Sequence, residues 1–239
     1  MKSMEVIPGI HLLSSFLGAG VWGANVYLLE DNDLTLVDTG FIGRSGQILR
    51  KVADLGYAPS DITRIIITHY HADHIGSLAM LKKVTQAKVL AHPADAPYIN
   101  GRLPEPGAAG PKWLGRSFTH FRRLWSAIAT SVDVLVNEGD ELPVLGGIKI
   151  LHTPGHTCGS ISLFCPSRRL IIVGDVIAHR FGLRLPSKTF TEDIAQEISS
   201  VRRIASLDFD VVCFGHGSPL RHGARNKVSD FARGLSLPS

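Results

Sequence analysis

One short histidine-rich segment constrains this chain more than any other feature: Thr68-His69-Tyr70-His71-Ala72-Asp73-His74. It follows the run Ile65–Thr68, whose β-branched composition predicts a buried strand, and precedes a helix predicted over Asp73–Lys83. Residues two apart in extended backbone point to the same side, so His69 and His71 share a side, and the following turn brings the other ligand-type side chains close. Burying imidazoles and a carboxylate is costly unless a partner satisfies them, and a divalent cation does so. The segment predicts a metal site at a strand end; the alternative interpretation is a polar, histidine-rich helix cap.

Three further ligand-type residues follow strand-like runs in the second half, each directly after a glycine: His156, Asp175 and His216. Loops at strand ends carry much of protein function, and glycine lets the backbone approach a neighbour closely. Any one of the three is typical of an ordinary turn, but together they extend the histidine-rich segment to a set of seven ligand-type residues. A single tetrahedral zinc takes about four ligands, so the set fits two metals better. Carboxylate suits a bridging position, which makes Asp175 the candidate bridge.

Short strand-like runs cluster and are followed by helical periodicity, twice along the chain. Helices are predicted over Gly46–Leu55 and Glu192–Ala205, where apolar residues recur at helical spacing. The chain has 239 residues, of which 44% are hydrophobic, so it can bury a substantial core without disulfides. We therefore expect a single domain over residues 1–239, built of two β-layers flanked by helices.

The stretch 101–131 departs from this pattern and reads as an insertion near the site. A Pro- and Gly-rich loop leads into an amphipathic helix predicted over Lys112–Ala129, with basic residues beside its apolar stripe. A helix packed on the core is the plain interpretation. The alternative interpretations are a lid over the substrate pocket and a surface that contacts a membrane, of which the membrane role is not favoured.

The charge and the cysteine content restrict which partners and which cellular compartment are expected. The formal net charge is +4, without a run of like charges, so nucleic acid is not an expected partner and a small-molecule substrate is. Three cysteines without a CxxC pair favour reduced thiols and a cytoplasmic location, and no signal peptide or membrane span is expected. No feature of the sequence specifies an oligomeric state.

The motif His69-x-His71-x-Asp73-His74, followed by the three later residues, resembles the metallo-β-lactamase superfamily over nearly the whole chain. The resemblance implies a four-layer αββα sandwich of two mixed β-sheets flanked by helices, with a dinuclear site at the edge of the sheets. It implies that one metal is held by His69, His71 and His156, the second by Asp73, His74 and His216, and that Asp175 bridges them. Asp73 and His216 are the predicted catalytic residues, with Asp73 orienting the nucleophile. Asp38, in Val37-Asp38-Thr39-Gly40, matches a position that supports the metal ligands from behind, because a metal-bound imidazole needs its other nitrogen oriented.

Differences from individual branches shape the functional expectation. An aspartate at position 175 is typical of the hydrolase branches similar to glyoxalase II and the lactonases, whereas class B β-lactamases carry cysteine or histidine there. The tyrosine that lactonases place soon after the bridge is missing, since Val176, Ile177 and Ala178 follow. Only 23 residues follow His216, too few for the helical substrate domain of glyoxalase II.

The predicted function is a metal-dependent hydrolase with two divalent ions, zinc in first place and iron or manganese as alternatives. A metal-bridging hydroxide would attack a small ester, thioester or lactone. One alternative is a persulfide-dioxygenase-like oxidoreductase with a single iron on His71, His156 and Asp175. Another is a non-catalytic scaffold stabilised by metal. Phe16 and Trp22, in the Ser14–Ala24 loop, and His179, four residues after Asp175, are predicted to line the substrate pocket.

Overall fold

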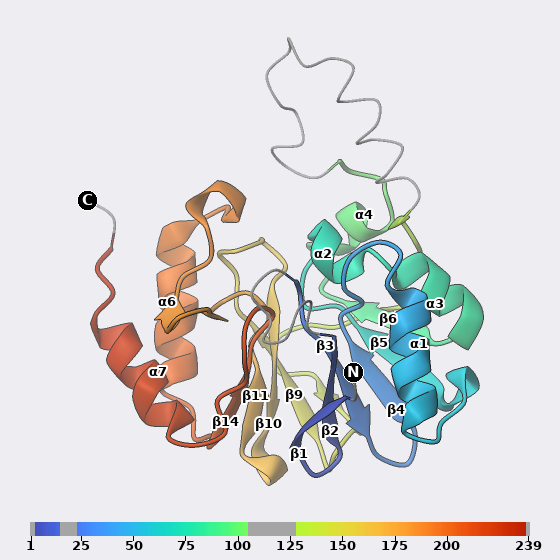
Figure 1. Cartoon of the computed structure of the whole chain (residues 1–239). Coiled ribbons are helices and arrows are strands. Elements are labelled where there is room, and N and C mark those ends of the chain that lie inside the picture. Colours follow the sequence, from blue (N-terminus) through green and yellow to red (C-terminus); the bar gives the residue numbers. More distant parts are fainter. Residues whose placement is uncertain (1–2, 15–22, 105–127, 238–239) are drawn as a thin grey trace.

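The computed structural model of the chain describes residues 3–14, 23–104 and 128–237. Two β-sheets face each other at the centre of the molecule, with helices on both outer sides (Figure 1). In the described part, the first sheet has seven strands in the order β1-β2-β3-β4-β5-β6-β7. Their bounds are Met4–Ile7, Ile10–Ser14, Val26–Glu30, Leu34–Val37, Ile62–Ile66, Lys88–Ala91 and Val134–Leu135. The first three pairings are antiparallel and the last three are parallel, so the sheet is mixed.

The second sheet has the order β14-β11-β10-β9-β8 within the described residues. Its strands, in chain order, are β8 Glu141–Leu142, β9 Ile148–His152, β10 Ile161–Cys165, β11 Leu170–Ile172 and β14 Val211–Cys213. Only the pairing of β11 with β14 is parallel, so this sheet is mixed as well. A small hairpin, β12 Ala178–His179 with β13 Leu183–Arg184, follows β11 along the chain.

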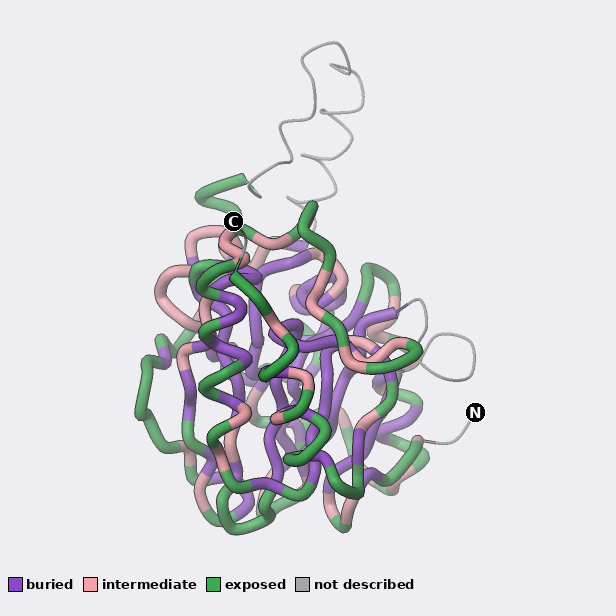
Figure 2. Tube along the Cα trace, turned by 90° about the vertical axis from the view of Figure 1, so that its left-hand side faces the viewer, coloured by how far each residue is buried: buried purple, intermediate pink, exposed green. Residues whose placement is uncertain are grey.

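Three layers of buried side chains hold the four layers of backbone together. One core lies between the sheets and joins residues such as Leu29 and Ile150, while a second packs α1 Ser45–Asp54 and α3 Leu78–Thr85 onto the first sheet. The third joins the second sheet to α6 Ile194–Ala205 and α7 Ala224–Arg233. Figure 2 shows the resulting pattern, with buried strands inside and exposed turns outside. The expected αββα sandwich is confirmed, because each sheet buries both of its faces.

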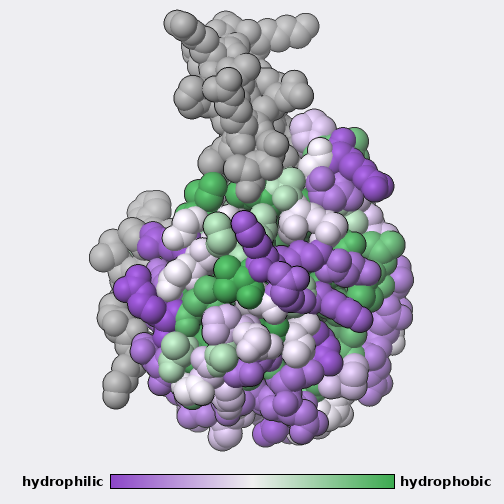
Figure 3. Space-filling view, turned by 90° about the vertical axis from the view of Figure 1, so that its right-hand side faces the viewer, coloured by the Kyte–Doolittle hydropathy of each residue, from purple (hydrophilic) through white to green (hydrophobic). Residues whose placement is uncertain are grey.

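The helices outside the first sheet are amphipathic. Ile48 and Val52 of α1 are buried, whereas Arg50 on the same helix is exposed. The outer surface on this side of the molecule is accordingly mostly hydrophilic, with apolar side chains in separate patches (Figure 3). No helix among the described residues is long and apolar enough to cross a membrane.

The predicted helix over Asp73–Lys83 is wrong in one respect, because the chain forms two helices there. A short helix, α2 Ala72–Ile75, ends at Gly76, and α3 begins at Leu78. A Cβ at Gly76 would overlap the backbone of Phe41 and Ile42, so the preceding loop packs directly onto this point. Ser77 fixes the junction, since its hydroxyl donates to Phe41 O (2.6 Å). The apolar periodicity continued across the break and concealed it.

The two sheets are joined by backbone hydrogen bonds at the edge where several strands end. Ile161 N donates to Thr68 O (2.9 Å), which links β10 to the segment after β5. Asn25 N donates to Gly215 O (2.7 Å), which links the residue before β3 to the turn that follows β14. Segments far apart in sequence therefore meet at one rim, which carries α2 at the upper end of the sheets in Figure 1.

Candidate metal centre

The first half of the chain supplies its four ligand-type residues from one continuous turn. His69 and His71 lie between β5 and α2, and Asp73 and His74 lie in α2 itself. His74 N and Ile75 N both donate to His71 O, so the helix starts within the segment and turns its ligands toward one point. His69, His71 and His74 are buried, and Asp73 is half-buried.

The second half supplies three residues from three separate turns, as the sequence predicted. His156 follows β9, Asp175 follows β11 and His216 follows β14. Glycine precedes each of them, and each glycine is in close contact with another element. A Cβ at Gly155 would overlap the backbone of Glu197 in α6, and one at Gly215 would overlap Asp175 Oδ1. At Gly174, where φ is +52°, a Cβ would lie 2.9 Å from Thr68 Cβ.

All seven predicted ligand residues come together, in three overlapping sets whose ligand atoms lie within 4.8 Å of one another. One set is His69, His71 and His156; the second is His69, His74 and Asp175; the third is Asp73, His74 and His216. His71 Nδ1 lies 2.9 Å from His156 Nε2, across the two halves of the chain. His216 Nε2 lies 3.1 Å from Asp73 Oδ2 and 3.2 Å from Asp175 Oδ2.

Several of these atoms are buried without a hydrogen-bond partner among the described residues. They are His69 Nε2, His74 Nε2 and Asp175 Oδ1. A buried polar atom is normally satisfied, and leaving one unpaired costs about 1–3 kcal/mol. All three belong to the convergent sets, and neutral imidazole and carboxylate are the donors that first-row divalent ions take. The residues therefore fit a metal centre.

Asp38 holds the first-half turn from behind. Its Oδ2 lies 2.8 Å from His74 Nδ1 and accepts a hydrogen bond from Thr68 Oγ1 (2.8 Å), while its Oδ1 accepts one from Thr68 N. With Nδ1–H donating to Asp38, the neutral form of His74 carries its free lone pair on Nε2, which faces the site. Asp38 has a φ of +61°, the left-handed region, which turns its carboxylate back toward Thr68. Asp38 therefore contacts the predicted ligand residue His74 directly.

Asp95, which the sequence did not single out, ties the two halves of the site together. Its Oδ2 accepts hydrogen bonds from Tyr70 N (3.0 Å) and Thr157 Oγ1 (2.8 Å), and its Oδ1 accepts one from Gly159 N (2.7 Å). Tyr70 stands between two ligand residues of the first half, and Thr157 follows His156. Burial raises the pKa of Asp95 to about 7, while these hydrogen bonds favour its ionised form. Nothing in the local sequence marks this residue, because its partners are distant along the chain.

The ionisable groups of the site divide into two classes. Burial lowers the pKa of His71 to about 3 and that of His156 to about 4, so both imidazoles are neutral at pH 7. Burial also acts on His74 and His216, but neighbouring carboxylates, Asp175 foremost, outweigh it and raise the pKa of His216 to about 9. Protons on these two imidazoles balance the carboxylate charges, and metal ions would take over that balance by displacing them.

Glu197 of α6 is a second residue that the sequence did not indicate. It is fully buried beside Gly155, and neither carboxyl oxygen accepts a hydrogen bond from a described residue. Burial raises the pKa of Glu197 to about 9, so the group is a neutral acid at pH 7.

A pocket opens directly onto the convergent ligands. His71, Asp73, His156, Asp175 and His216 lie on its floor. Its walls include four apolar residues, Phe41, Leu185, Pro186 and Phe190. They also include two arginines, Arg180 and Arg184, which follow Asp175 in the hairpin of β12 and β13.

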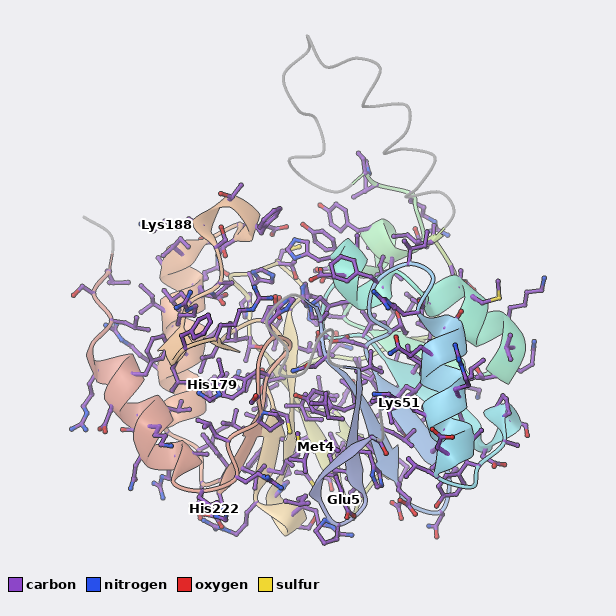
Figure 4. All side chains as sticks on the ribbon, viewed as in Figure 1. Met4, Glu5, Lys51, His179, Lys188 and His222 are labelled. Carbon is purple, nitrogen blue, oxygen red and sulfur yellow. The ribbon has the colours of Figure 1, made fainter. Side chains whose placement is uncertain are left out.

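One predicted pocket residue, His179, does not line this pocket. Its Nδ1 lies 2.6 Å from Ser218 O, and its ring lies beside Phe214. Figure 4 marks His179 below Lys188. Phe16, Trp22 and nearly all of the predicted helix Lys112–Ala129 lie outside the described residues.

Comparison with known proteins gives a family match over most of the chain. The model of the metallo-beta-lactamase superfamily matches residues 19–216. The probable metallo-hydrolase YflN of Bacillus subtilis is 28% identical over 97% of this chain and 93% of its own length. A hydroxyacylglutathione hydrolase of Rhodopseudomonas palustris is 28% identical over 63% of this chain and 47% of its own length.

Solved structures show the same fold. A metallo-beta-lactamase family protein of Thermus thermophilus, TTHA1429, matches with a TM-score of 0.75 and 23% identity, over 96% of this chain and 80% of its own. The subclass B3 metallo-beta-lactamase BJP-1 of Bradyrhizobium japonicum matches with a TM-score of 0.71 and 22% identity, over 98% and 90% of the two chains.

Proposed function

We propose that the site of this chain, a metallo-hydrolase belonging to the metallo-β-lactamase superfamily, holds two divalent metal ions. The proposed reaction is the hydrolysis of a small ester, thioester or lactone. The observation that carries the proposal is the convergence of seven ligand-type residues from both halves of the chain into three overlapping sets, with the ligand atoms of each set within 4.8 Å of one another. Zinc is the proposed metal, because its preferred donors are those present.

The three overlapping sets suggest how the ligands divide. His69, His71 and His156 would hold one ion, and Asp73, His74 and His216 the other. Asp175 would bridge them, since its oxygens lie 3.5 Å from His156 Nε2, 3.5 Å from His74 Nε2 and 3.2 Å from His216 Nε2.

Two bound ions would lower the pKa of a shared water toward ~7 and polarise the carbonyl oxygen of the substrate. The protein's own residues prepare the place for this chemistry. Burial keeps His71 and His156 neutral and therefore competent as ligands. Asp73, half-buried at the pocket floor, would accept a hydrogen bond from the water and orient it toward the carbonyl carbon.

Support for the hydrolytic reaction comes from the family and from the name of a relative. Hydroxyacylglutathione hydrolase is named for a hydrolysis, and its similarity covers 63% of this chain. The pocket beside the ligands admits a small molecule, which we propose as the partner of this site. Reduced cysteines support a cytoplasmic location: no disulfide is found among the described residues, and Cys165 and Cys213 are buried free thiols.

The experiment is metal analysis of purified protein together with a hydrolysis assay. We expect two zinc ions per chain and turnover of 4-nitrophenyl and thioester substrates that is lost on chelation and restored by zinc. His216→Ala should lose metal and activity. His222→Ala is the matched control, because His222 is exposed and Figure 4 places it at the opposite end of the molecule. One iron per chain with oxygen consumption would replace this proposal by the oxygenase alternative, and bound metal without turnover by the scaffold alternative.

A further inference from the structure

Two arginines line the pocket beside the ligand residues, and neither is paired with a carboxylate among the described residues. Arg180 is half-buried and Arg184 is exposed, and both belong to the hairpin that follows Asp175. Some other arginines of the described chain are paired with carboxylates, as Arg169 is with Asp208 and Asp210. An arginine held in a pocket without an acidic partner is a typical oxyanion-binding group.

Arg180 contacts His216 through one guanidinium nitrogen. Arg180 Nη2 lies 2.7 Å from His216 Nδ1, which in turn lies 3.1 Å from Gly23 O. A guanidinium only donates and a carbonyl oxygen only accepts, so Nδ1 either accepts from Arg180 or donates to Gly23 O, but not both.

Metal binding would select the second arrangement. For Nε2 of His216 to serve as a ligand, the neutral ring must carry its hydrogen on Nδ1. In that form the Arg180 guanidinium lacks an acceptor at His216. Its Nε is buried without a hydrogen-bond partner among the described residues.

Most of the remaining pocket wall is apolar. Phe41, Leu185, Pro186 and Phe190 line it together with the arginines. The Phe190 ring lies 6.4 Å from the ring of His71, which places this apolar wall beside the ligands.

We propose that the substrate of this site carries an oxyanion group, carboxylate or phosphate-like, which Arg180 binds directly while the apolar wall covers an aliphatic or aromatic portion. This inference rests on the proposed hydrolase function for the position of the scissile bond. Arg184 adds a second, more exposed positive charge at the mouth. The substrate thus places its reactive carbonyl over the ligands and its anion one imidazole ring away, against Arg180.

The kinetic test compares two esters of the same shape. Mono-4-nitrophenyl adipate ends in a carboxylate, and 4-nitrophenyl 6-methylheptanoate ends in an isopropyl group at the same position. We expect the zinc-loaded protein to prefer the charged ester. In Arg180→Ala, the ratio of kcat/KM for the charged ester to that for the neutral ester should fall at least about tenfold, or about 1.4 kcal/mol. Arg180→Lys should restore part of the ratio, and Arg184→Ala should lower it less.

Arg50→Ala is the matched control, since it also removes one positive charge but lines a separate hollow along α1. Its ratio should equal that of the unchanged protein. An equal fall of both esters in Arg180→Ala would show that Arg180 acts on His216 instead of the substrate, and would overturn the proposal, as would an unchanged ratio.

A binding test separates this inference from the hydrolytic function. Adipate, 5-phosphonopentanoate and 6-methylheptanoate share one carboxylate and a four-carbon chain, and differ only in the far group. Calorimetric titration of zinc-loaded protein should show tighter binding of the first or second than of the third, with the difference lost in Arg180→Ala. The order of the first two identifies the anion. Arg180-dependent binding without ester turnover would refute the proposed reaction and keep the anion site. Turnover with equal binding of all three compounds would refute the anion site and keep the proposed reaction.

Discussion

The two halves of the site reach the same rim by different routes. The first half places four ligand-type residues within six consecutive positions, all on the turn from β5 into α2. The second half sends one residue from each of three turns, and a glycine directly precedes each one. The first group is therefore shaped by local backbone conformation and by Asp38 behind it. The second group depends on close approach between turns that only glycine permits.

This difference predicts where one added side-chain atom would displace the ligand residues most. In the first half the crowded glycine, Gly76, packs against Phe41 and Ile42, outside the ligand set, whereas in the second half the crowded glycines directly precede ligand-type residues. Gly174 lies against Thr68, and Gly215 lies against Asp175 and His74. The second half is therefore the more sensitive to backbone crowding, although it contributes fewer ligands.

The largest effect is expected from Gly215→Ala. The new Cβ would overlap Asp175 Oδ1 and lie 2.9 Å from His74 Cε1, so the proposed bridge and one imidazole must both move. We expect kcat/KM to fall at least about 100-fold, the scale of losing a positioned catalytic group, with metal content reduced. Metal analysis and ester kinetics measure it.

Gly46→Ala is the control for Gly215→Ala. A Cβ at Gly46, in α1, meets nothing within 4 Å, so metal content should be unchanged and stability should rise by up to ~1 kcal/mol. Full metal content and activity in Gly215→Ala would show that the second half adapts as readily as the first.

Asp95→Asn tests the link between the halves and should have the next largest effect. An amide nitrogen would face a donor at one of the two oxygen positions, which now accept from Tyr70 N, Thr157 Oγ1 and Gly159 N. We expect zinc affinity to fall about 10- to 100-fold, as for other residues that orient ligands from behind. Competition with a chromogenic zinc chelator measures the affinity.

The matched control is Asp133→Asn. Asp133 also accepts a backbone hydrogen bond, from Val89 N (2.8 Å), but it pairs with Lys82 away from the ligands. Its loss should leave zinc affinity unchanged. Equal affinity in Asp95→Asn and the unchanged protein would mean that the halves hold their ligands independently.

The same contrast explains what the sequence predicts. The ligands of the first half are adjacent, so spacing alone identifies them, whereas the role of Asp38 is implied by the resemblance to the family. The single ligands of the second half are recognisable because each couples a glycine to a ligand-type side chain after a strand. Asp95 and Glu197 act through partners distant in sequence, and no local pattern marks them. The break at Gly76 escaped for the same reason, since its cause is the backbone of Phe41 and Ile42.

The smallest effect on the site is expected from Glu197→Gln, which probes the helix behind the second half. Unfolded glutamate loses its proton near its ordinary pKa of 4.5, whereas burial raises the pKa of native Glu197 to about 9. Between these values the native state holds the extra proton, so the stability of the unchanged protein falls as pH rises. Each pKa unit corresponds to about 1.4 kcal/mol, so from pH 5 to pH 7 the unchanged protein should lose roughly 2 kcal/mol relative to Glu197→Gln. Urea unfolding of zinc-loaded proteins at both pH values measures this difference, and parallel pH profiles of the two proteins would contradict a neutral, buried acid behind His156.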